Sequence, residues 1–356
     1  MDGSGFGKAF HITTFGESHG KGIGVVIQGC PPGITINEAA VQAALDRRKP
    51  GQGIAGTKRK EPDKARFLSG IFDGKTTGTP ITIFIENRDA RSKSYDAIAR
   101  LFRPGHGDYS YQKKYGIRDY RGGGRSSARE TAARVAAGAV AQLILDRENI
   151  RITSFTLAIG GIRAKDIRQI ERKEANGLQC PDPDAVRAME ERIEQVKNQG
   201  DSLGGIVQII AENVPPGLGD PVFDKLDADL AKALMGIGAV KAVEIGAGID
   251  AAQKTGFENN DQIFPDGFET NHSGGILAGI SNGDDIVARV HVKPIPSILK
   301  EQETIDMDGN PAKISTRGRH DISAVPRINK VCEAMTAIVI ADHLLRQRMI
   351  DPGPAR

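Results

Sequence analysis

A basic, glycine-rich segment spanning residues 103–134 constrains this chain more strongly than any other stretch. It holds eight Lys or Arg residues against three acids, and four of the five tyrosines of the chain. Three consecutive glycines, Gly122 to Gly124, lead through Arg-Ser-Ser into a helix pattern, and Ser127 with Glu130 fits a capping box. A flexible run before a capped helix leaves backbone N–H groups to bind an anion. With arginines on both sides, the segment predicts a phosphate site.

Length, charge and cysteine usage exclude several classes of protein. The chain has 356 residues, enough for one large or two medium domains, and its net charge of +3 gives no global signal for nucleic acid or an anionic membrane. Three widely separated cysteines argue against a disulfide framework or a structural zinc site and favour a reducing cytosol. The sequence shows no signal-peptide pattern and no apolar run of about 18 residues. The composition predicts a soluble, cytoplasmic protein without a metal.

Hydrophobic periodicity predicts an α+β protein. The strand patterns cover residues 22–29, 66–72, 81–87, 151–162, 205–214 and 285–294. The longest helix patterns cover residues 128–146, 181–200 and 328–348. A further helix is expected from a capping box formed by Thr35 and Glu38 to a stop at Pro50, with Arg48 on its apolar face.

The domain organisation follows from these patterns. We expect residues 1–350 to form a single domain, residues 351–356 to be a disordered tail, and the polar stretch 51–63 to be a mobile loop. The order strand, Pro-Pro-Gly, helix occurs at 25–45 and again at 207–234. This recurrence indicates either two halves of related architecture or a chance repeat of a generic turn.

Two nucleotide-binding motifs are incomplete. Gly70 and Gly74 in GIFDGKTTG are separated by three residues rather than four, so no phosphate loop is expected there. Asp73-Gly74 is instead predicted to form a hairpin turn. Residues 242–251 match G-x-G-x-x-A after a strand, but the following residues have no helical apolar face, which argues against a dinucleotide fold.

Basic residues cluster at three glycine-flanked positions, two of which also hold a histidine. The clusters are Arg103 with His106, Arg125 with its two serines, and the segment 317–327 around His320 and Asp321. Arginine suits bidentate contacts with carboxylates and phosphates, and histidine titrates near neutral pH. The clusters therefore predict acid–base chemistry on an anionic substrate, by a lyase or a transferase acting on a phosphorylated carboxylate.

Several of these signals have alternatives. His19, in the turn GESHG, is either an exposed loop histidine or a general acid–base group. Arg47, Arg48 and Lys49 either favour the negative end of a helix dipole or bind a ligand. The RGGGR sequence with interleaved tyrosines also resembles an RNA-binding segment, but it precedes a capped helix in a nearly neutral chain, which argues against RNA.

Five stretches together resemble the chorismate synthase family. They are GESHG at 16–20, the segment 103–139, NVPPGLGDPVFDKLDADLAKALM at 213–235, NHSGGILAGIS at 271–281 and GRHD at 318–321. The resemblance implies the last step of the shikimate pathway, which is the anti-1,4-elimination of phosphate from 5-enolpyruvylshikimate 3-phosphate to give chorismate. It implies a requirement for reduced FMN (FMNH2) although the reaction has no net redox change. It also implies the family's fold, with helices sandwiched between antiparallel β-sheets, and a homotetramer.

The resemblance assigns roles to individual residues. His106 would be the acid near the departing phosphate, His19 would protonate or stabilise the flavin, and Asp321 would help to move the substrate proton through the flavin N5. The substrate's phosphate and carboxylates would bind Ser18, Arg48, Arg103 and Arg129. Arg129 has the alternative of pairing with Glu130 or Asp146 on its own helix. The FMN contacts would be Arg125, Ser126, Ser127, Gly238, Ala239, Ala278, Lys293, Pro294, Ile295, Pro296, Ser297 and Arg319.

Some positions depart from the family pattern. Gly107 and Ala278 stand where Ala and Gly are common, and Ile322-Ser323 follows HD where Pro-Cys is common. Ile54 stands where some relatives place an arginine linked to NADPH or FMN binding, so that contact is not expected here. No flavin-reductase insertion is visible, which implies that FMN is reduced by an external source, with NADPH as a candidate reductant.

Overall fold

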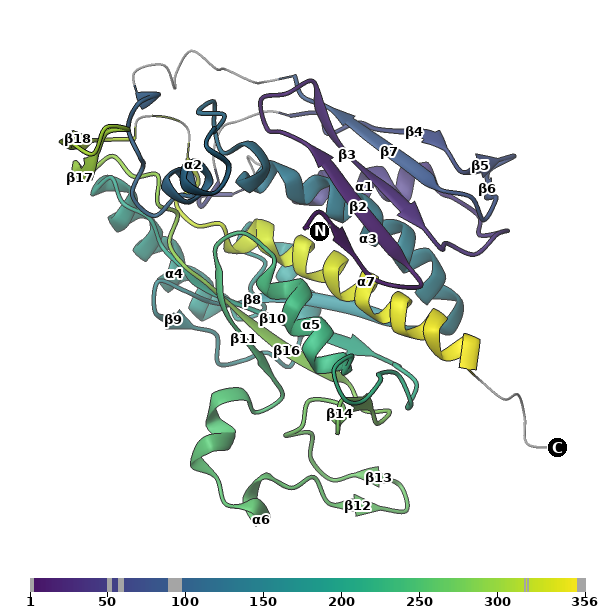
Figure 1. The fold of residues 1–356 in the computed structure, drawn as a ribbon. Helices are drawn as coiled ribbons and strands as arrows, with labels where there is room; N and C mark the ends of the chain where they lie inside the picture. The colour runs from purple at the N-terminus through teal and green to yellow at the C-terminus, as the bar shows by residue number, and fades with distance from the viewer. Residues whose placement is uncertain are drawn as a thin grey trace.

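Two five-stranded antiparallel sheets enclose a layer of helices in the computed structural model, which describes residues 3–49, 53–56, 61–88, 98–316, 318 and 320–350 (Figure 1). The N-terminal sheet has the order β1 (Gly5–Phe6), β2 (His11–Gly16), β3 (Gly22–Gln28), β7 (Ile81–Glu86) and β4 (Ala65–Ser69). The C-terminal sheet has the order β11 (Val240–Ile245), β16 (Ile286–Val292), β10 (Gly205–Glu212), β8 (Arg151–Ile159) and β9 (Ile162–Arg163). The predicted α+β fold with sandwiched helices is confirmed.

Alternating apolar residues orient the strands of the C-terminal sheet. Along β16, Ile286, Ala288, Val290 and Val292 are buried, whereas the residues between them are partly exposed. Successive side chains of a strand point to opposite faces, so this alternation turns one face of β16 toward the helices. The strand predicted over 285–294 is therefore present with the expected inward face.

The helix layer consists of α1 (Glu38–Arg48), α3 (Thr131–Leu145), α5 (Leu226–Met235) and α7 (Val325–Ile350). α3 packs on β3 and β7, α7 packs on β8 and β10, and the two helices pack on each other. They approach closely where they cross, because a Cβ added to Gly138 would lie 2.4 Å from the Cβ of Ala334. Small side chains thus set the distance between the two central helices.

A buried carboxylate fastens the start of the chain to its last helix. Oδ1 of Asp342, in α7, accepts hydrogen bonds from the backbone N–H groups of Lys8 at 2.9 Å, Ala9 at 2.6 Å and Phe10 at 2.8 Å. Asp342 is buried, and Phe10 is fully buried beside it. The first strands of the N-terminal sheet are therefore held by residues more than 330 positions away.

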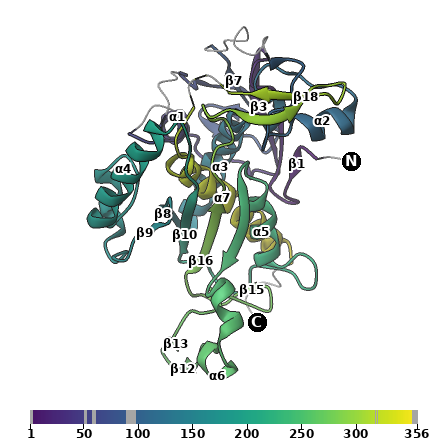
Figure 2. The ribbon, with the colours of Figure 1, turned by 90° about the vertical axis from the view of Figure 1, so that its left-hand side faces the viewer.

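Smaller elements extend from this sandwich. α4 (Pro183–Asn198) begins at the buried N-cap Asp182, whose side chain accepts from the N–H groups of Asp184 and Ala185. Between β11 and β16 an arm projects away from both sheets (Figure 2). It carries α6 (Gly256–Asn259), β12 (Ile263–Phe264) and β13 (Gly267–Phe268), with the hairpin of β14 (Ile276–Leu277) and β15 (Ile280–Ser281) at its base. The other α-helix and β-strands of the described residues are α2 (Asp108–Tyr115), β5 (Ile71–Phe72), β6 (Lys75–Thr76), β17 (Gln302–Ile305) and β18 (Pro311–Ile314).

Several turns follow the sequence predictions. Asp73 and Gly74 join β5 to β6 with φ of +48° and +69°, as a two-residue hairpin turn with two left-handed residues requires. Strand, Pro-Pro-Gly and helix follow one another at β3–α1 and at β10–α5. After β11 the chain enters a short 3₁₀ turn, Gly248–Gln253, and not a long helix, which agrees with the rejection of a dinucleotide fold.

Both predicted capping boxes are wrong in detail. The N-cap of α1 is Asn37, whose side chain accepts from the N–H of Ala40, and not Thr35. Ser127 does cap a helical turn, the 3₁₀ segment Ala128–Glu130 that precedes α3. Glu130 does not reach back to it, because its carboxylate accepts from Thr14 and from Arg134. Tertiary partners outcompete the local cap in this second case.

Three further observations bear on the composition. All three cysteines are buried free thiols. Among the described residues, no group of His, Cys, Asp and Glu side chains could hold a metal ion. None of the helices in the described ranges has the length and apolar character needed to cross a membrane. The expected disordered tail, residues 351–356, lies outside the described residues.

Candidate active site

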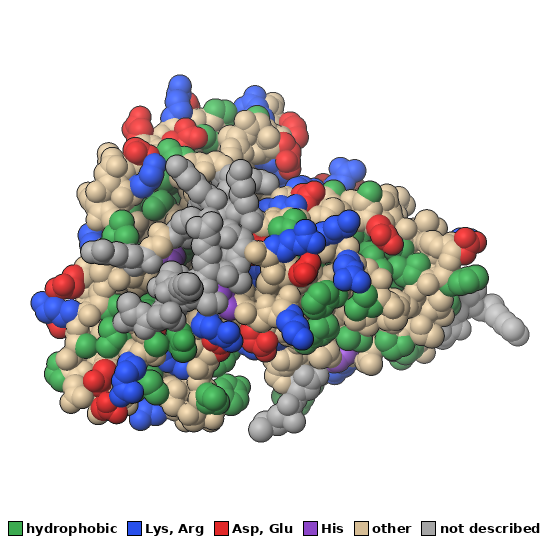
Figure 3. Space-filling view, turned by 90° about the horizontal axis from the view of Figure 1, so that it is seen from above, with side chains coloured by type: hydrophobic (Ala, Val, Ile, Leu, Met, Phe, Trp, Pro, Cys, Tyr) green, Lys and Arg blue, Asp and Glu red, His purple; other side chains and the backbone are tan. Residues whose placement is uncertain are grey.

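A cavity of about 1250 Å³ lies where five parts of the chain meet. Its walls come mainly from residues 103–107, 122–131, 232–239, 293–297 and 320–328. Most sites for one small ligand measure roughly 300–1,000 Å³, so this cavity has room for more than one molecule. In the view of Figure 3, Lys and Arg side chains and histidines lie close together near the middle of the face. The cavity is therefore suited to anions.

The cavity collects most of the residues singled out from the sequence. Those in its wall are His19, His106, Asp321, Arg48, Arg103, Arg129, Arg125, Ser126, Ser127, Gly238, Ala239, Lys293, Ile295, Pro296 and Ser297. Ser18 is buried and contacts His19, and Pro294 lies between two wall residues. Ala278 does not line the cavity, because it lies in the turn between β14 and β15 with φ of +52°. Arg317 and Arg319 lie outside the described residues.

His106 is held as a neutral imidazole in one tautomer. Its Nδ1 lies 3.2 Å from the carbonyl oxygen of Pro104, which can only accept, so Nδ1 carries the proton. Its Nε2 lies 2.9 Å from Oγ of Ser297 and accepts a hydrogen bond from that hydroxyl. Burial, together with the charge of Arg103, lowers the pKa of His106 from 6.5 to about 4. At neutral pH Nε2 is therefore a proton acceptor.

The loop that carries His106 rests directly on residues 293–297. Lys293 donates from Nζ to the carbonyl oxygen of Gly105 at 2.7 Å. Gly105 has φ of +71°, and a Cβ at this position would lie 2.8 Å from the Cβ of Pro296. Both the left-handed backbone conformation and the lack of space for a Cβ require glycine at this position. Two segments nearly 190 residues apart in sequence thus form one wall of the cavity.

Arg103 is fixed beside this loop by a buried carboxylate. It donates from Nε and Nη2 to the two oxygens of Asp108, each at 2.7 Å, and from Nη2 to the carbonyl oxygen of Gly122 at 2.7 Å. Asp108 is the first residue of α2. Burial alone would raise the pKa of Asp108, but the hydrogen bonds and charge of Arg103 lower it overall, so the carboxylate is ionised. A bidentate pair of this kind holds a guanidinium in one orientation.

The glycine run brings the backbone against His19. Gly122 has φ of +80°, and a Cβ there would lie 2.5 Å from Cε1 and 2.6 Å from Nδ1 of the His19 ring. Nδ1 of His19 also lies 3.2 Å from Oγ of Ser18. The glycine therefore permits the contact that places His19 in the cavity wall.

Arg125 ties the following serine turn to the N-terminal sheet. It donates from Nη2 to Oγ1 of Thr14 at 2.8 Å and to the Thr14 carbonyl oxygen at 3.1 Å, and from Nη1 to that of Gly16 at 3.2 Å. Ser126 donates to the carbonyl oxygen of Gly123 at 2.7 Å. The turn before α3 is thus a fixed structure that presents hydroxyl groups to the cavity.

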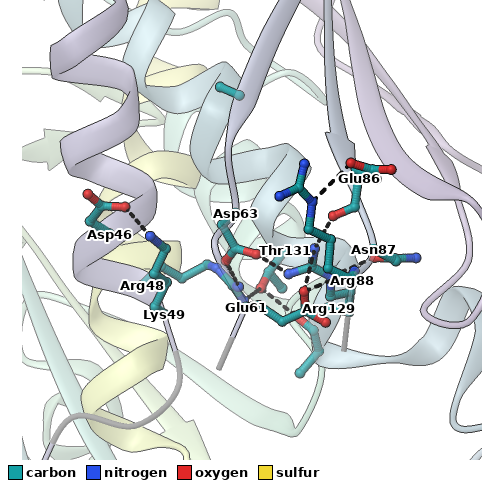
Figure 4. A network of polar contacts seen from close by, with 12 residues as sticks. Asp46, Arg48, Lys49, Glu61, Asp63, Glu86, Asn87, Arg88, Arg129 and Thr131 are labelled. Carbon is teal, nitrogen blue, oxygen red and sulfur yellow. Dashed lines mark hydrogen bonds and ion pairs between the residues drawn. The ribbon is translucent and has the colours of Figure 1, made fainter. Parts of the chain in front are cut away.

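Arg48 and Arg129 share a carboxylate that the sequence did not single out (Figure 4). Asp63 accepts from Nη2 of Arg48 at 2.6 Å and also from Nη1 of Arg129. Arg129 therefore pairs with neither Glu130 nor Asp146. The prediction of a mobile loop over 51–63 was wrong for Asp63, which is fully buried.

Asp321 extends the same charged region. It is buried and accepts from Nη1 of Arg327 at 2.5 Å. Nε of Arg327 in turn donates to the backbone oxygen of Arg48 at 3.4 Å. The segment before α7 is thereby connected to the end of α1 at the cavity wall.

The tyrosines of residues 103–134 have structural partners. Tyr109 packs edge-on against Phe102, with ring centroids 5.4 Å apart. Tyr111 and Tyr115 contact each other and line the cavity, which no local signal had indicated because α2 lacks an apolar period. Lys232 of α5 is a further wall residue that sequence reasoning missed.

An α+β sandwich whose cavity gathers buried arginines and partly buried histidines is the architecture of a protein that binds an anionic small molecule. A protein-family model, described as chorismate synthase, matches residues 10–345. The chorismate synthase of Desulfosudis oleivorans is 63% identical over 351 residues, covering 98% of this chain and 99% of that protein. The chorismate synthase of Desulfatibacillum aliphaticivorans is 60% identical and covers 98% of both chains. The chain belongs to the chorismate synthase family.

A solved structure supports the same assignment. The crystal structure of a chorismate synthase matches with a TM-score of 0.77 and 35% sequence identity, covering 96% of this chain and 93% of that one. The resemblance drawn from the five sequence stretches is confirmed. These comparisons offer no support for the RNA-binding alternative.

Proposed function

We propose that this chain catalyses the elimination of phosphate from 5-enolpyruvylshikimate 3-phosphate to give chorismate, as a carbon–oxygen lyase. One observation carries the proposal. Three buried arginines, Arg48, Arg103 and Arg129, line one cavity with His19 and His106 in a chain whose family match spans residues 10–345. A substrate with one phosphate and two carboxylates needs such a set of fixed cations.

The residues of the cavity fit a flavin mononucleotide next to this substrate. The volume of about 1250 Å³ exceeds the needs of one ligand. Ser126, Ser127 and Lys293 provide hydroxyl donors and a cation for an anionic group. Ala239 has a left-handed backbone conformation, with φ of +75°, and lines the cavity beside the end of β16. When bound and reduced, FMN would supply electron density that helps phosphate to leave, with no net redox change.

The residues of the chain would bind the substrate, support the cofactor and move protons. Arg48, Arg103 and Arg129 would bind and orient the anionic groups of the substrate, and the buried wall would exclude water. His106 would hold the proton for the departing phosphate. Its imidazole is neutral without ligand, and a dianionic phosphate near Nε2 would favour the charged form and raise its pKa. His19 would support the cofactor, and Asp321 would assist removal of the substrate proton.

The assembly, reductant and location belong to the same proposal. We expect a homotetramer in the cytoplasm, supplied with reduced FMN by an external source, for which NADPH is the candidate electron donor. Family membership supports these expectations.

Phosphate release tests the proposal directly. Purified protein with dithionite-reduced FMN and 5-enolpyruvylshikimate 3-phosphate, kept anaerobic, should release inorganic phosphate and form chorismate in equal amounts. The matched control uses oxidised FMN, with which turnover should be absent because the electron-rich cofactor is missing. A folded protein that releases no phosphate with reduced FMN would overturn the proposal.

A further inference from the structure

Asp63 bridges two arginines of the cavity wall. Its Oδ2 accepts from Nη2 of Arg48 at 2.6 Å, and its Oδ1 accepts from Nη1 of Arg129. Asp63 is 0% exposed, Arg48 1% and Arg129 5%. Both arginines line the cavity, whereas Asp63 does not line it and lies between the two arginines (Figure 4). The carboxylate joins the last residue of α1 to the turn before α3.

Asn87 continues this set of contacts toward the histidine turn. Its Oδ1 accepts from Nε of Arg129 at 2.8 Å. Its Nδ2 donates to the backbone oxygens of Glu17 at 2.9 Å and Gly20 at 3.0 Å, which flank His19. The side chain follows directly after β7. One amide therefore ties the arginine to the turn that carries the histidine.

The two arginines differ in how their donors are used. Arg129 donates hydrogen bonds from Nε to Asn87, from Nη1 to Asp63 and from Nη2 to the backbone oxygen of Glu86 at 3.3 Å. Arg48 has one strong bond, to Asp63, and a long one of 3.4 Å from Nη1 to Thr131. Its Nε is buried and has no hydrogen-bond acceptor among the described residues. Arg48 is thus fixed at one end of its guanidinium group by Asp63.

The charge of Asp63 is stable in this setting. Burial alone would raise its pKa, but the charges and hydrogen bonds of Arg48 and Arg129 lower the pKa overall. The carboxylate therefore stays ionised at neutral pH, and both guanidinium groups remain bonded to it. Groups held in this way need little reordering when a ligand arrives.

We propose that Asp63 and Asn87 are positioning residues for the reaction: Asp63 fixes Arg48 and Arg129 for the anionic groups of the substrate, and Asn87 fixes the His19 turn against Arg129. Neither side chain lines the cavity, so both act through the residues that do. The inference rests on the proposed function, because it takes these arginines and His19 to face substrate and cofactor.

The two residues should affect different kinetic constants. An arginine contact that is the same in the bound substrate and in the transition state stabilises both states equally. Loss of such a contact therefore raises KM with little change in kcat. The position of His19 matters for the chemical step, so its loss lowers kcat. A merely structural role for either residue would not divide the constants in this way.

The Asp63→Asn variant tests the first half. It keeps the size of the side chain and removes the charge that both guanidinium groups share. We expect KM for 5-enolpyruvylshikimate 3-phosphate to rise about 10- to 100-fold, because charge-assisted hydrogen bonds are lost. The affinity for FMN alone should stay within about twofold of the native value, since its proposed contacts lie elsewhere in the wall. Substrate affinity is also measured by calorimetry with oxidised FMN, which needs no turnover.

The Asn87→Leu variant tests the second half and carries no buried charge, so it stays informative if Asp63→Asn does not fold. We expect a fall in kcat of at least about tenfold, with KM changed less than kcat, because the histidine turn loses two of its anchors. Asp182→Asn is the matched control. It removes a buried carboxylate that caps α4 outside the cavity, and it should lower the melting temperature without changing either constant.

The outcomes separate the inference from the proposed function. Native kinetics and native substrate affinity in folded Asp63→Asn and Asn87→Leu, beside an active native chain, would overturn the inference alone. If kcat fell and KM rose by the same factor in all three variants, the effect would be general destabilisation. This result would also overturn the inference. A native chain that neither binds the substrate nor releases phosphate would overturn the proposed function, and the inference with it.

Discussion

His106 lies in an environment that differs strongly from that of a free side chain. Its Nδ1 proton is committed to the carbonyl oxygen of Pro104, and its Nε2 accepts from Ser297. Burial and the nearby charge of Arg103 disfavour the imidazolium, so the fold itself selects the neutral ring. A group in this state becomes a proton donor only after an anion compensates both effects. Substrate binding would thus prepare the acid that the reaction needs.

The same residue predicts how stability depends on pH. The pKa of His106 is about 4 in the folded protein and near 6.5 when unfolded, so the unfolded chain binds more protons between these values. The contribution is fully present above pH 6.5 and is lost as pH falls toward 4, amounting to about 3 kcal/mol. Urea unfolding at pH 7 and pH 4.5 should show a smaller decrease for His106→Asn than for the native chain. Equal decreases would contradict the assignment.

At the scale of elements, periodic segments were predictable and aperiodic ones were not. The alternation in β16 and the long apolar face of α7 gave strand and helix correctly because each pattern repeats over seven or more residues. α2 escaped prediction because its eight residues are mostly polar and contain no apolar period. The cap of α1 was also predicted wrongly, because Asn37, and not Thr35, accepts the capping hydrogen bond from the N–H of Ala40.

The site residues also fall into those that local sequence motifs predicted and those that only tertiary contacts reveal. His19, His106 and Asp321 stand in local motifs, and the structure brings them to one cavity wall. Asp63 has no local signal, because its partners lie 15 and 66 positions away and meet it only in the folded chain. Asn87 is similar, since its role depends on contacts with Arg129 and the turn before β3. Tertiary contacts of this kind leave no periodicity to detect.

The crossing of α3 and α7 supports a stability prediction. A methyl group at Gly138 would meet Cβ of Ala334 at 2.4 Å and its Cα at 2.5 Å. We expect Gly138→Ala to destabilise the protein by about 1–3 kcal/mol through overpacking, more than the roughly 1 kcal/mol that alanine gains in helix propensity.

Thermal and urea unfolding of the purified variant measure this change. Adding Ala334→Gly should restore only part of the loss, because the backbone oxygen of residue 334 also lies 2.8 Å from the new methyl group. A Gly138→Ala variant as stable as the native chain would show that the helices can separate freely.

At the scale of the molecule, the cavity wall connects the proposed substrate and cofactor regions. The loop of His106 contacts Ser297 directly, and Lys293 bonds to Gly105, so the proposed substrate and cofactor walls are one connected surface. A ligand that orders one wall orders part of the other. We therefore predict that the substrate tightens FMN binding by about tenfold, within the usual range of coupling between sites. Flavin fluorescence titrations with and without substrate measure it, and identical affinities would contradict a shared wall.

The clasp between Asp342 and the backbone of residues 8–10 has a consequence for synthesis of the chain. Its three hydrogen bonds join positions separated by 332 to 334 residues. During translation residues 8–10 are made before Asp342, which follows them by 332 to 334 positions. The N-terminal strands must therefore wait for the synthesis of more than 330 further residues before they are anchored, and native contacts at such separation form slowly. A chain that stops short of α7 would leave both sheets without the helix that packs between them and the first strands without their anchor.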